Sequence, residues 1–219
     1  MYNKSDIELK VAEFLLQIKA IKLQPNNPFT WASGWKSPIY CDNRITLSHP
    51  QVRTYIRQKL AQAIQEEFGS VDVIAGVATA GIPQGVLVAQ ELGLPFIYVR
   101  AKAKEHGTGS LIEGEVVEGQ RVMVIEDLIS TGKSSLQAVD ALRAAGLSVA
   151  GLVAIFTYGF DHADENFANA KCRYSTLSNY STLINYAAEH SFIAQNDIDL
   201  LNKWRETPSE WGKDAIVNS

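Results

Sequence analysis

The chain has 219 residues, of which 46% are hydrophobic and 20% are charged, and it carries a formal net charge of −4. This composition is typical of a globular protein with a substantial core, and the acidic balance argues against a nucleic-acid-binding surface. The most apolar run, Leu147 to Phe160, is too short and too interrupted to span a bilayer. Cys41 and Cys172 show no metal-ligand spacing, so we expect a protein of the reducing cytoplasm.

The N-terminal part predicts a helix followed by a small separate substructure. Apolar residues at helical spacing indicate a helix from Ser5, as its cap, to about Lys19. The segment from Pro28 to Arg44 is rich in aromatic residues and is interrupted by Ser33-Gly34, which predicts two short strands outside the main sheet. We call this part of the chain, about residues 20–45, the hood. A second helix is expected from His49-Pro50 to about Phe68.

Strands and helices then alternate to the end of the chain. Apolar, β-branched runs predict strands at 71–76, 95–99, 122–125 and 148–157, and a final edge strand is expected at 171–177. Helical spacing predicts helices at 84–92, from 136 towards 146, and at 161–170, 182–189 and 197–204. This order predicts a single domain, residues 1–219, with an open, mostly parallel α/β sheet flanked by helices and a small N-terminal hood. Its core would span about 50–178, and the C-terminal helices and tail about 180–219.

Polar chemistry is concentrated where the strand at 122–125 meets the next helix. Glu126 and Asp127 follow the strand, and hydroxyl side chains surround Gly132, namely Ser130, Thr131, Ser134 and Ser135. A helix start at the carboxyl end of a parallel strand favours an anion, and the hydroxyls can donate to phosphate oxygens. The carboxylates suit ribose hydroxyls or a hydrated Mg²⁺ ion. An ordinary helix cap would explain one hydroxyl only, and a Walker P-loop is excluded because its first glycine would fall on Asp127.

Two further segments could face the same ligand. The small-residue turn at 76–83, which includes Thr79 and Ala80, is compatible with an anion-binding nest or simply with a tight connection. In the segment 100–109 basic side chains occupy every second position, at Arg100, Lys102, Lys104 and His106. In an extended chain they would share one side, which predicts an anionic partner, whereas a solvated charged loop is the alternative.

The stretch from Val124 to Ser135 resembles the phosphoribosyl-diphosphate (PRPP) signature of the type I phosphoribosyltransferase family. The shared pattern is an apolar strand, two acids, two apolar residues and then Ser-Thr-Gly-x-Ser. The resemblance implies that PRPP binds here, with Mg²⁺ held through the diphosphate and water near the acid pair. The residues it implies for PRPP binding are Glu126, Asp127, Leu128, Ile129, Ser130, Thr131, Gly132, Lys133 and Ser134. Outside the signature it adds Thr79, Ala80, Arg100, Lys104 and His106.

A narrower resemblance lies in the hood, between Phe29 and Arg44. Phe-Thr-x-x-Ser-Gly-x-Lys-Ser-Pro, followed by an aromatic residue and Asp-Asn-Arg, is similar to the orotate-specific members of that family. This implies transfer of ribose 5-phosphate from PRPP to orotate in pyrimidine (UMP) biosynthesis, with Tyr40 stacked on the base and Ser130 in contact with it. The implied catalytic cations are Arg100, Lys102, Lys104 and His106. Their loop, about 100–113, would close over the neighbouring site of a homodimer.

Three positions depart from the family pattern. Many relatives carry a lysine where this chain has Ala32, a Tyr-Lys pair where it has Thr79-Ala80, and near Tyr158 an arginine that contacts the orotate carboxylate. We predict that Arg44 replaces this arginine. Two alternatives stay open, a phosphoribosyltransferase for a purine or uracil and a non-catalytic PRPP-binding regulator. The regulator would need a nucleic-acid-binding module, and the sequence shows no basic helix-turn-helix stretch.

Overall fold

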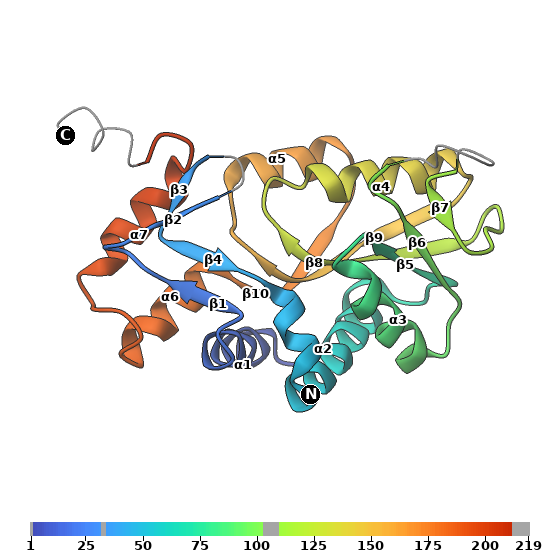
Figure 1. Ribbon diagram of the computed structural model, residues 1–219. Helices are drawn as coiled ribbons and strands as arrows, with labels where there is room; N and C mark the ends of the chain where they lie inside the picture. Colours follow the sequence, from blue (N-terminus) through green and yellow to red (C-terminus); the bar gives the residue numbers. More distant parts are fainter. Residues whose placement is uncertain (1, 32–33, 103–109, 212–219) are drawn as a thin grey trace.

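The computed structural model describes residues 2–31, 34–102 and 110–211. Its centre is a six-stranded sheet with the strand order β10-β9-β8-β5-β6-β7 (Figure 1). Neighbouring strands are parallel throughout, except that β7 pairs antiparallel with β6 at one edge. In chain order the strands are β5 (Val73–Val77), β6 (Phe96–Val99), β7 (Ile112–Glu113), β8 (Arg121–Ile129), β9 (Ser148–Thr157) and β10 (Tyr174–Asn179).

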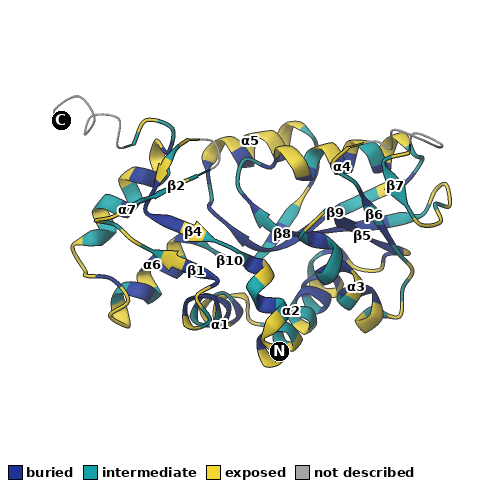
Figure 2. Cartoon of the chain, in the orientation of Figure 1, coloured by how far each residue is buried: buried dark blue, intermediate teal, exposed yellow. Residues whose placement is uncertain are grey.

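Helices cover both faces of this sheet (Figure 1). One face carries α1 (Lys4–Gln17), α2 (Pro50–Ala63) with its π-helical continuation η2 (Ile64–Phe68), and α3 (Gly81–Leu92). The other carries α4 (Lys133–Ala144) and α5 (Asp161–Asn169), while α6 (Tyr180–Glu189) and α7 (Asp197–Glu206) lie beside the hood. Figure 2 shows the central strands buried between helices whose outward faces are exposed. No helix within the described ranges has the length and apolarity needed to cross a membrane.

The hood consists of two small antiparallel strand pairs and a 3-10 helix. β1 (Ile21–Leu23) pairs with β4 (Ile39–Cys41), and β2 (Phe29–Thr30) pairs with β3 (Lys36–Ser37). The helix η1 (Asn43–Ser48) then contacts β8 and leads into α2. The two expected short strands are confirmed as β2 and β3. The pairing of β1 with β4 was not predicted, because such short strands are stabilised by their non-local partner and not by a sequence pattern of their own.

The predicted alternation of strands and helices is confirmed, but several boundaries differ. β8 continues to Ile129, so the acid pair lies on the strand and not after it. The first helix begins at Lys4 after Asn3, so the expected cap at Ser5 is wrong. The edge strand begins at Tyr174 and not at Lys171, because Lys171 has a left-handed φ of 49° that cannot continue a strand.

Candidate functional site

The acid pair lies near the carboxyl end of β8, inside the sheet. Glu126 is 5% exposed, and its carboxylate accepts hydrogen bonds from the Asp127 backbone N–H at 3.0 Å and from the Ser135 hydroxyl at 3.3 Å. Burial raises the pKa of Glu126 well above its ordinary value, and the negative charge of Asp127 raises it further. Burial also raises the pKa of Asp127. This pair therefore favours a ligand that brings hydroxyl donors or positive charge.

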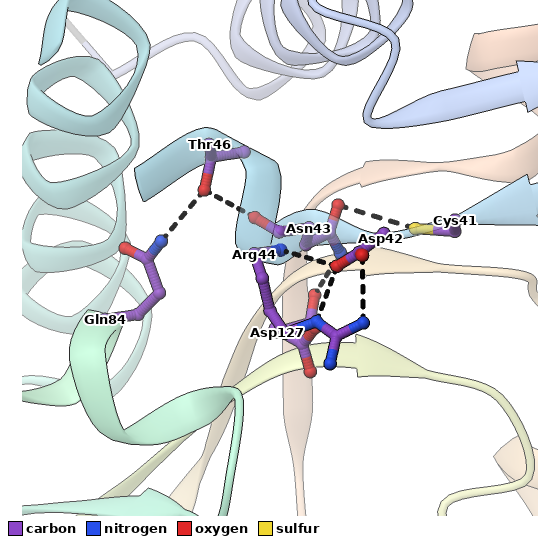
Figure 3. A network of polar contacts seen from close by, with 7 residues as sticks. All are labelled: Cys41, Asp42, Asn43, Arg44, Thr46, Gln84 and Asp127. Carbon is purple, nitrogen blue, oxygen red and sulfur yellow. Dashed lines mark hydrogen bonds and ion pairs between the residues drawn. The ribbon is translucent and has the colours of Figure 1, made fainter. Parts of the chain in front are cut away.

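Asn43, the first residue of η1, connects the hood to this acid pair (Figure 3). It is 1% exposed, and its Nδ2 donates to the backbone carbonyl of Asp127 at 2.7 Å. The Asn43 Oδ1 accepts a hydrogen bond from the Cys41 thiol at 3.4 Å, and its backbone carbonyl accepts one from the Thr46 hydroxyl at 2.6 Å. The sequence analysis identified Asn43 only as part of the Asp-Asn-Arg motif. Its hydrogen-bond partner lies 84 residues further along the chain, so no local pattern indicated this contact.

The predicted phosphate loop, residues 130–134, joins β8 to α4 and is supported from behind by α5. Gly132 has a φ of 77°, and a Cβ atom there would lie 2.7 Å from the Phe167 ring, so only glycine fits this position without strain. Asn166 Nδ2 donates to the Thr131 carbonyl at 3.1 Å. Ser130 and Thr131 are half-buried, whereas Lys133 and Ser134 are exposed at the start of the helix. The Ile129 side chain is buried in the core, so a ligand could meet only its backbone.

The small-residue turn between β5 and α3 lies directly beside the acid pair. A Cβ atom on Gly81 would lie 2.5 Å from the Ile125 carbonyl oxygen and 3.4 Å from the Glu126 Cα. Thr79 is exposed and Ala80 is half-buried, and the Ala78–Thr79 peptide bond is cis. This close approach places the turn next to the signature strand, as the anion-nest interpretation requires.

The basic segment begins at the end of β6. A cavity of about 620 Å³ is lined by Arg100 and Lys102 on one side and by one face of α4, from Ser134 to Ala144, on another. Arg100 also forms an ion pair with Glu113 at 3.3 Å. The structure thus brings two of the predicted cations to the same cavity as a phosphate-loop hydroxyl. Lys104 and His106, which were predicted to act with them, lie outside the described residues.

A second pocket, of about 300 Å³, lies between the hood and the ends of β8 and β9. Its lining residues are Thr30, Trp31, Tyr40, Cys41, Leu128, Ser130 and Tyr158. Tyr40 is 40% exposed and its ring lies 5.7 Å from that of Phe29. Two residues predicted to contact a base, Tyr40 and Ser130, therefore line one pocket. Ser130 also begins the phosphate loop, so this pocket is adjacent to the site predicted for the ribose phosphate.

Arg44, the third residue predicted to contact the base, does not line this pocket. Its guanidinium binds the Asp42 carboxylate in a bidentate manner, with Nε–Oδ1 at 2.6 Å and Nη2–Oδ2 at 2.9 Å (Figure 3). These hydrogen bonds lower the pKa of Asp42 and raise the pKa of Arg44. Arg44 is therefore paired with Asp42 within the hood, and its side chain is 63% exposed.

The pocket wall includes two aromatic residues whose positions the sequence did not reveal. Trp31 donates from its indole Nε1 to the Ile39 carbonyl at 3.1 Å, and its ring lies 5.4 Å from that of Tyr158. Tyr158 is 3% exposed, and burial raises its pKa well above the ordinary value. Trp204 of α7 packs edge-on against both rings, at 5.7 Å and 5.8 Å. The C-terminal helices therefore hold the hood and the end of β9 together.

The residues at the site fit a magnesium ion that is held mainly by substrate. Among the described residues no group of three or more His, Cys, Asp or Glu side chains could hold a metal ion alone. Mg²⁺ commonly binds through one or two carboxylates together with phosphate oxygens and water. Asp127 is the more accessible member of the acid pair, because Glu126 is buried and already hydrogen-bonded.

Comparisons with known proteins agree with this geometry. Residues 46–187 match the family model described as the phosphoribosyl transferase domain. The orotate phosphoribosyltransferase of Phocaeicola vulgatus is 56% identical over 205 residues, which are 94% of this chain and 97% of that protein. The crystal structure of orotate phosphoribosyltransferase from Aeropyrum pernix matches with a TM-score of 0.72 and 27% identity, over 84% of this chain and 99% of that one. The Mycobacterium tuberculosis H37Rv orotate phosphoribosyltransferase in complex with PRPP matches with a TM-score of 0.64 and 25% identity, over 81% and 98%.

Proposed function

The chain belongs to the orotate phosphoribosyltransferases of the type I phosphoribosyltransferase family, and we propose how its own residues carry out their reaction. These enzymes are pentosyltransferases of pyrimidine biosynthesis and generally use Mg²⁺. The reaction moves ribose 5-phosphate from PRPP to orotate, giving orotidine 5′-monophosphate and diphosphate. The observation that carries our assignment is that one loop borders both cavities, through Ser130 in the smaller and Ser134 in the larger.

In this proposal the donor PRPP lies across the end of β8. The loop 130–134 binds the 5-phosphate through its hydroxyls and backbone N–H groups at the start of α4, including those of Thr131, Gly132 and Lys133. Glu126 and Asp127 accept hydrogen bonds from the ribose hydroxyls. Leu128 and Ile129 contribute backbone and wall contacts between these two groups, and Thr79 and Ala80 face the diphosphate.

The departure of diphosphate leaves positive charge on the ribose and negative charge on the leaving group. No protein nucleophile is needed, and the barrier falls when fixed cations stabilise the developing charge. Arg100 and Lys102 border the larger cavity, and we propose that Lys104 and His106 act with them. Bound Mg²⁺ would supply further positive charge at the diphosphate. Closure of the segment 100–113 over the neighbouring subunit's site would exclude water.

The base is proposed to lie in the smaller pocket. Tyr40 stacks on the pyrimidine ring and Ser130 donates to or accepts from its edge. The prediction that Arg44 binds the orotate carboxylate requires its guanidinium to give up at least one of its two hydrogen bonds to Asp42, or to bind both carboxylates at once. We further propose that the chain is one domain that works as a cytoplasmic homodimer.

The test is a panel of bases incubated with protein, PRPP and Mg²⁺ while diphosphate release is followed. Orotate should be consumed far faster than uracil, hypoxanthine or guanine. Faster turnover of a purine or of uracil would favour the alternative of another base specificity. PRPP binding without release of diphosphate from any base would favour a regulator.

A further inference from the structure

Among the described residues that line the pocket assigned to the base, none carries a charged side chain. Orotate is ionised at neutral pH, and a carboxylate that leaves water needs a charged or strongly donating partner. The lysine and the arginine that many relatives carry are replaced here by Ala32 and Tyr158. A cation next to the pocket would supply such a partner, and the hood, which forms one side of the pocket, contains Lys22, Lys36 and Arg44.

Two hood cations are poorly placed for this role. The Arg44 guanidinium already donates two hydrogen bonds to the Asp42 carboxylate. Lys22 lies opposite Tyr40 in the pairing of β1 with β4, but its charge acts on the Asp42 carboxyl, whose pKa it helps to lower. Both positive charges are thus partly balanced by the same carboxylate.

Lys36 is placed differently. It lies directly opposite Thr30 in the β2–β3 pair, so both side chains emerge on the same face of the hairpin. Its Nζ donates to the Thr30 hydroxyl at 2.8 Å, and Thr30 lines the pocket. Lys36 itself is not a lining residue, but its ammonium group is hydrogen-bonded to one, and no carboxylate of the described residues forms an ion pair with it.

We propose that Lys36, oriented by Thr30, binds the carboxylate of orotate and gives the pocket its preference for an anionic pyrimidine. This inference rests on the proposed function, since it assigns the partner of a group that only this substrate carries. A lysine ammonium has three donors, so it can keep its bond to Thr30 and donate to a carboxylate oxygen at the same time.

The variants Lys36→Ala, Lys36→Gln and Lys36→Arg separate charge from structure. Glutamine can keep the hydrogen bond to Thr30 but carries no charge, whereas arginine keeps the charge. With Lys36→Ala and Lys36→Gln, kcat/KM for orotate should fall about 10- to 100-fold, mainly through KM, since a hydrogen bond to a charged group is lost. Lys36→Arg should retain most of the wild-type value. The KM for PRPP should not change in any of the three.

Uracil supplies the second readout, because it has the same ring without the carboxylate. Its inhibition constant against orotate should be the same in the wild type and in all three variants. The matched control is Lys59→Ala on α2, because the Lys59 amine also donates to a neutral side chain, Gln62, at 2.9 Å. This control should leave the KM for orotate unchanged.

Each outcome decides between distinct explanations. A normal orotate KM in Lys36→Gln would overturn the proposal, as would an equal loss of orotate and uracil affinity, which would indicate a structural role. A large orotate defect in Arg44→Ala, with none in Lys36→Ala, would assign the carboxylate to Arg44 instead. If the wild-type protein does not use orotate, the proposed function itself fails, and this result is obtained before any variant is tested.

Discussion

The side-chain amide of Asn43 donates to the backbone carbonyl of Asp127, and this bond joins the hood to the strand that carries the acid pair. The Thr131 carbonyl is held in the same way by Asn166 from α5. Two asparagines from outside the PRPP signature thus bind backbone carbonyls within it. Because these carbonyls are already bonded within the protein, the N–H groups and hydroxyls of the loop are the polar groups that can bind phosphate.

Replacing Asn43 with alanine should weaken PRPP binding. The change leaves the Asp127 carbonyl without its donor, which costs about 1–3 kcal/mol of stability, and it frees the backbone next to the ribose site. The KM for PRPP should rise, as measured by initial rates at saturating orotate. Asn179→Ala is the matched control, because Asn179 caps α6 through the Thr182 N–H, lies two strands away from β8 and lines neither cavity, so it should lower only the melting temperature. Equal KM values in both variants would contradict a positioning role for Asn43.

Replacing Gly132 with alanine should disrupt the phosphate loop. The left-handed φ of 77° costs an L-residue about 1–2 kcal/mol, and the added Cβ would collide with the Phe167 ring. We expect loss of measurable PRPP binding by calorimetry while the circular dichroism spectrum stays native. Gly119→Ala provides the comparison, since Gly119 has a φ of 84° but no atom near the added methyl group. The Gly119→Ala protein should lose stability and keep its affinity for PRPP. If the Gly132→Ala protein also keeps its affinity for PRPP, the phosphate loop tolerates displacement and the prediction is wrong.

Glu126→Gln should stabilise the fold at neutral pH while impairing catalysis. The pKa of Glu126 is raised in the folded state, so that state binds the proton more tightly than the unfolded chain. Stability is therefore lost as pH rises from the ordinary carboxyl pKa to the raised one, by about 1.4 kcal/mol for each pH unit that separates the two values. Urea unfolding at increasing pH above the ordinary carboxyl pKa of 4.5 should show this decline in the wild type and a flatter profile in Glu126→Gln. The control variant Glu165→Gln, at an exposed position on α5, should show the same dependence of stability on pH as the wild type. If Glu126→Gln also shows the wild-type dependence, Glu126 is not the group that causes the decline.

Mixed dimers can test whether the basic loop acts on the neighbouring site. Asp127→Asn should bind PRPP weakly because it removes charge at the ribose and Mg²⁺ position, and Lys104→Ala should reduce turnover about 100- to 1000-fold. When the two variants exchange subunits, a loop acting on its neighbour gives one site with both defects and one with neither. Activity should then recover towards half of the wild type. A loop acting on its own subunit leaves a defect in each site, so no recovery would exclude the proposed arrangement.

The sequence by itself determined the features that depend on neighbouring residues. The contiguous run from Val124 to Ser135 specifies a buried strand, an acid pair and a hydroxyl-rich helix start, because strand and helix periodicity and helix-end chemistry are local properties. The alternation of strands and helices likewise predicted the parallel sheet, since short βα units leave few other topologies. For the same reason the family could be recognised before any contact was known.

Only the tertiary structure decided which distant side chains meet. The base pocket combines the hood at Tyr40, the end of β8 at Ser130 and the end of β9 at Tyr158, and no periodicity relates these positions. The bond from Asn43 to Asp127 likewise depends on how the hood lies against β8. The contacts between the hood and the sheet link residues far apart in the chain, so their geometry is set by packing of the whole core and not by the local sequence.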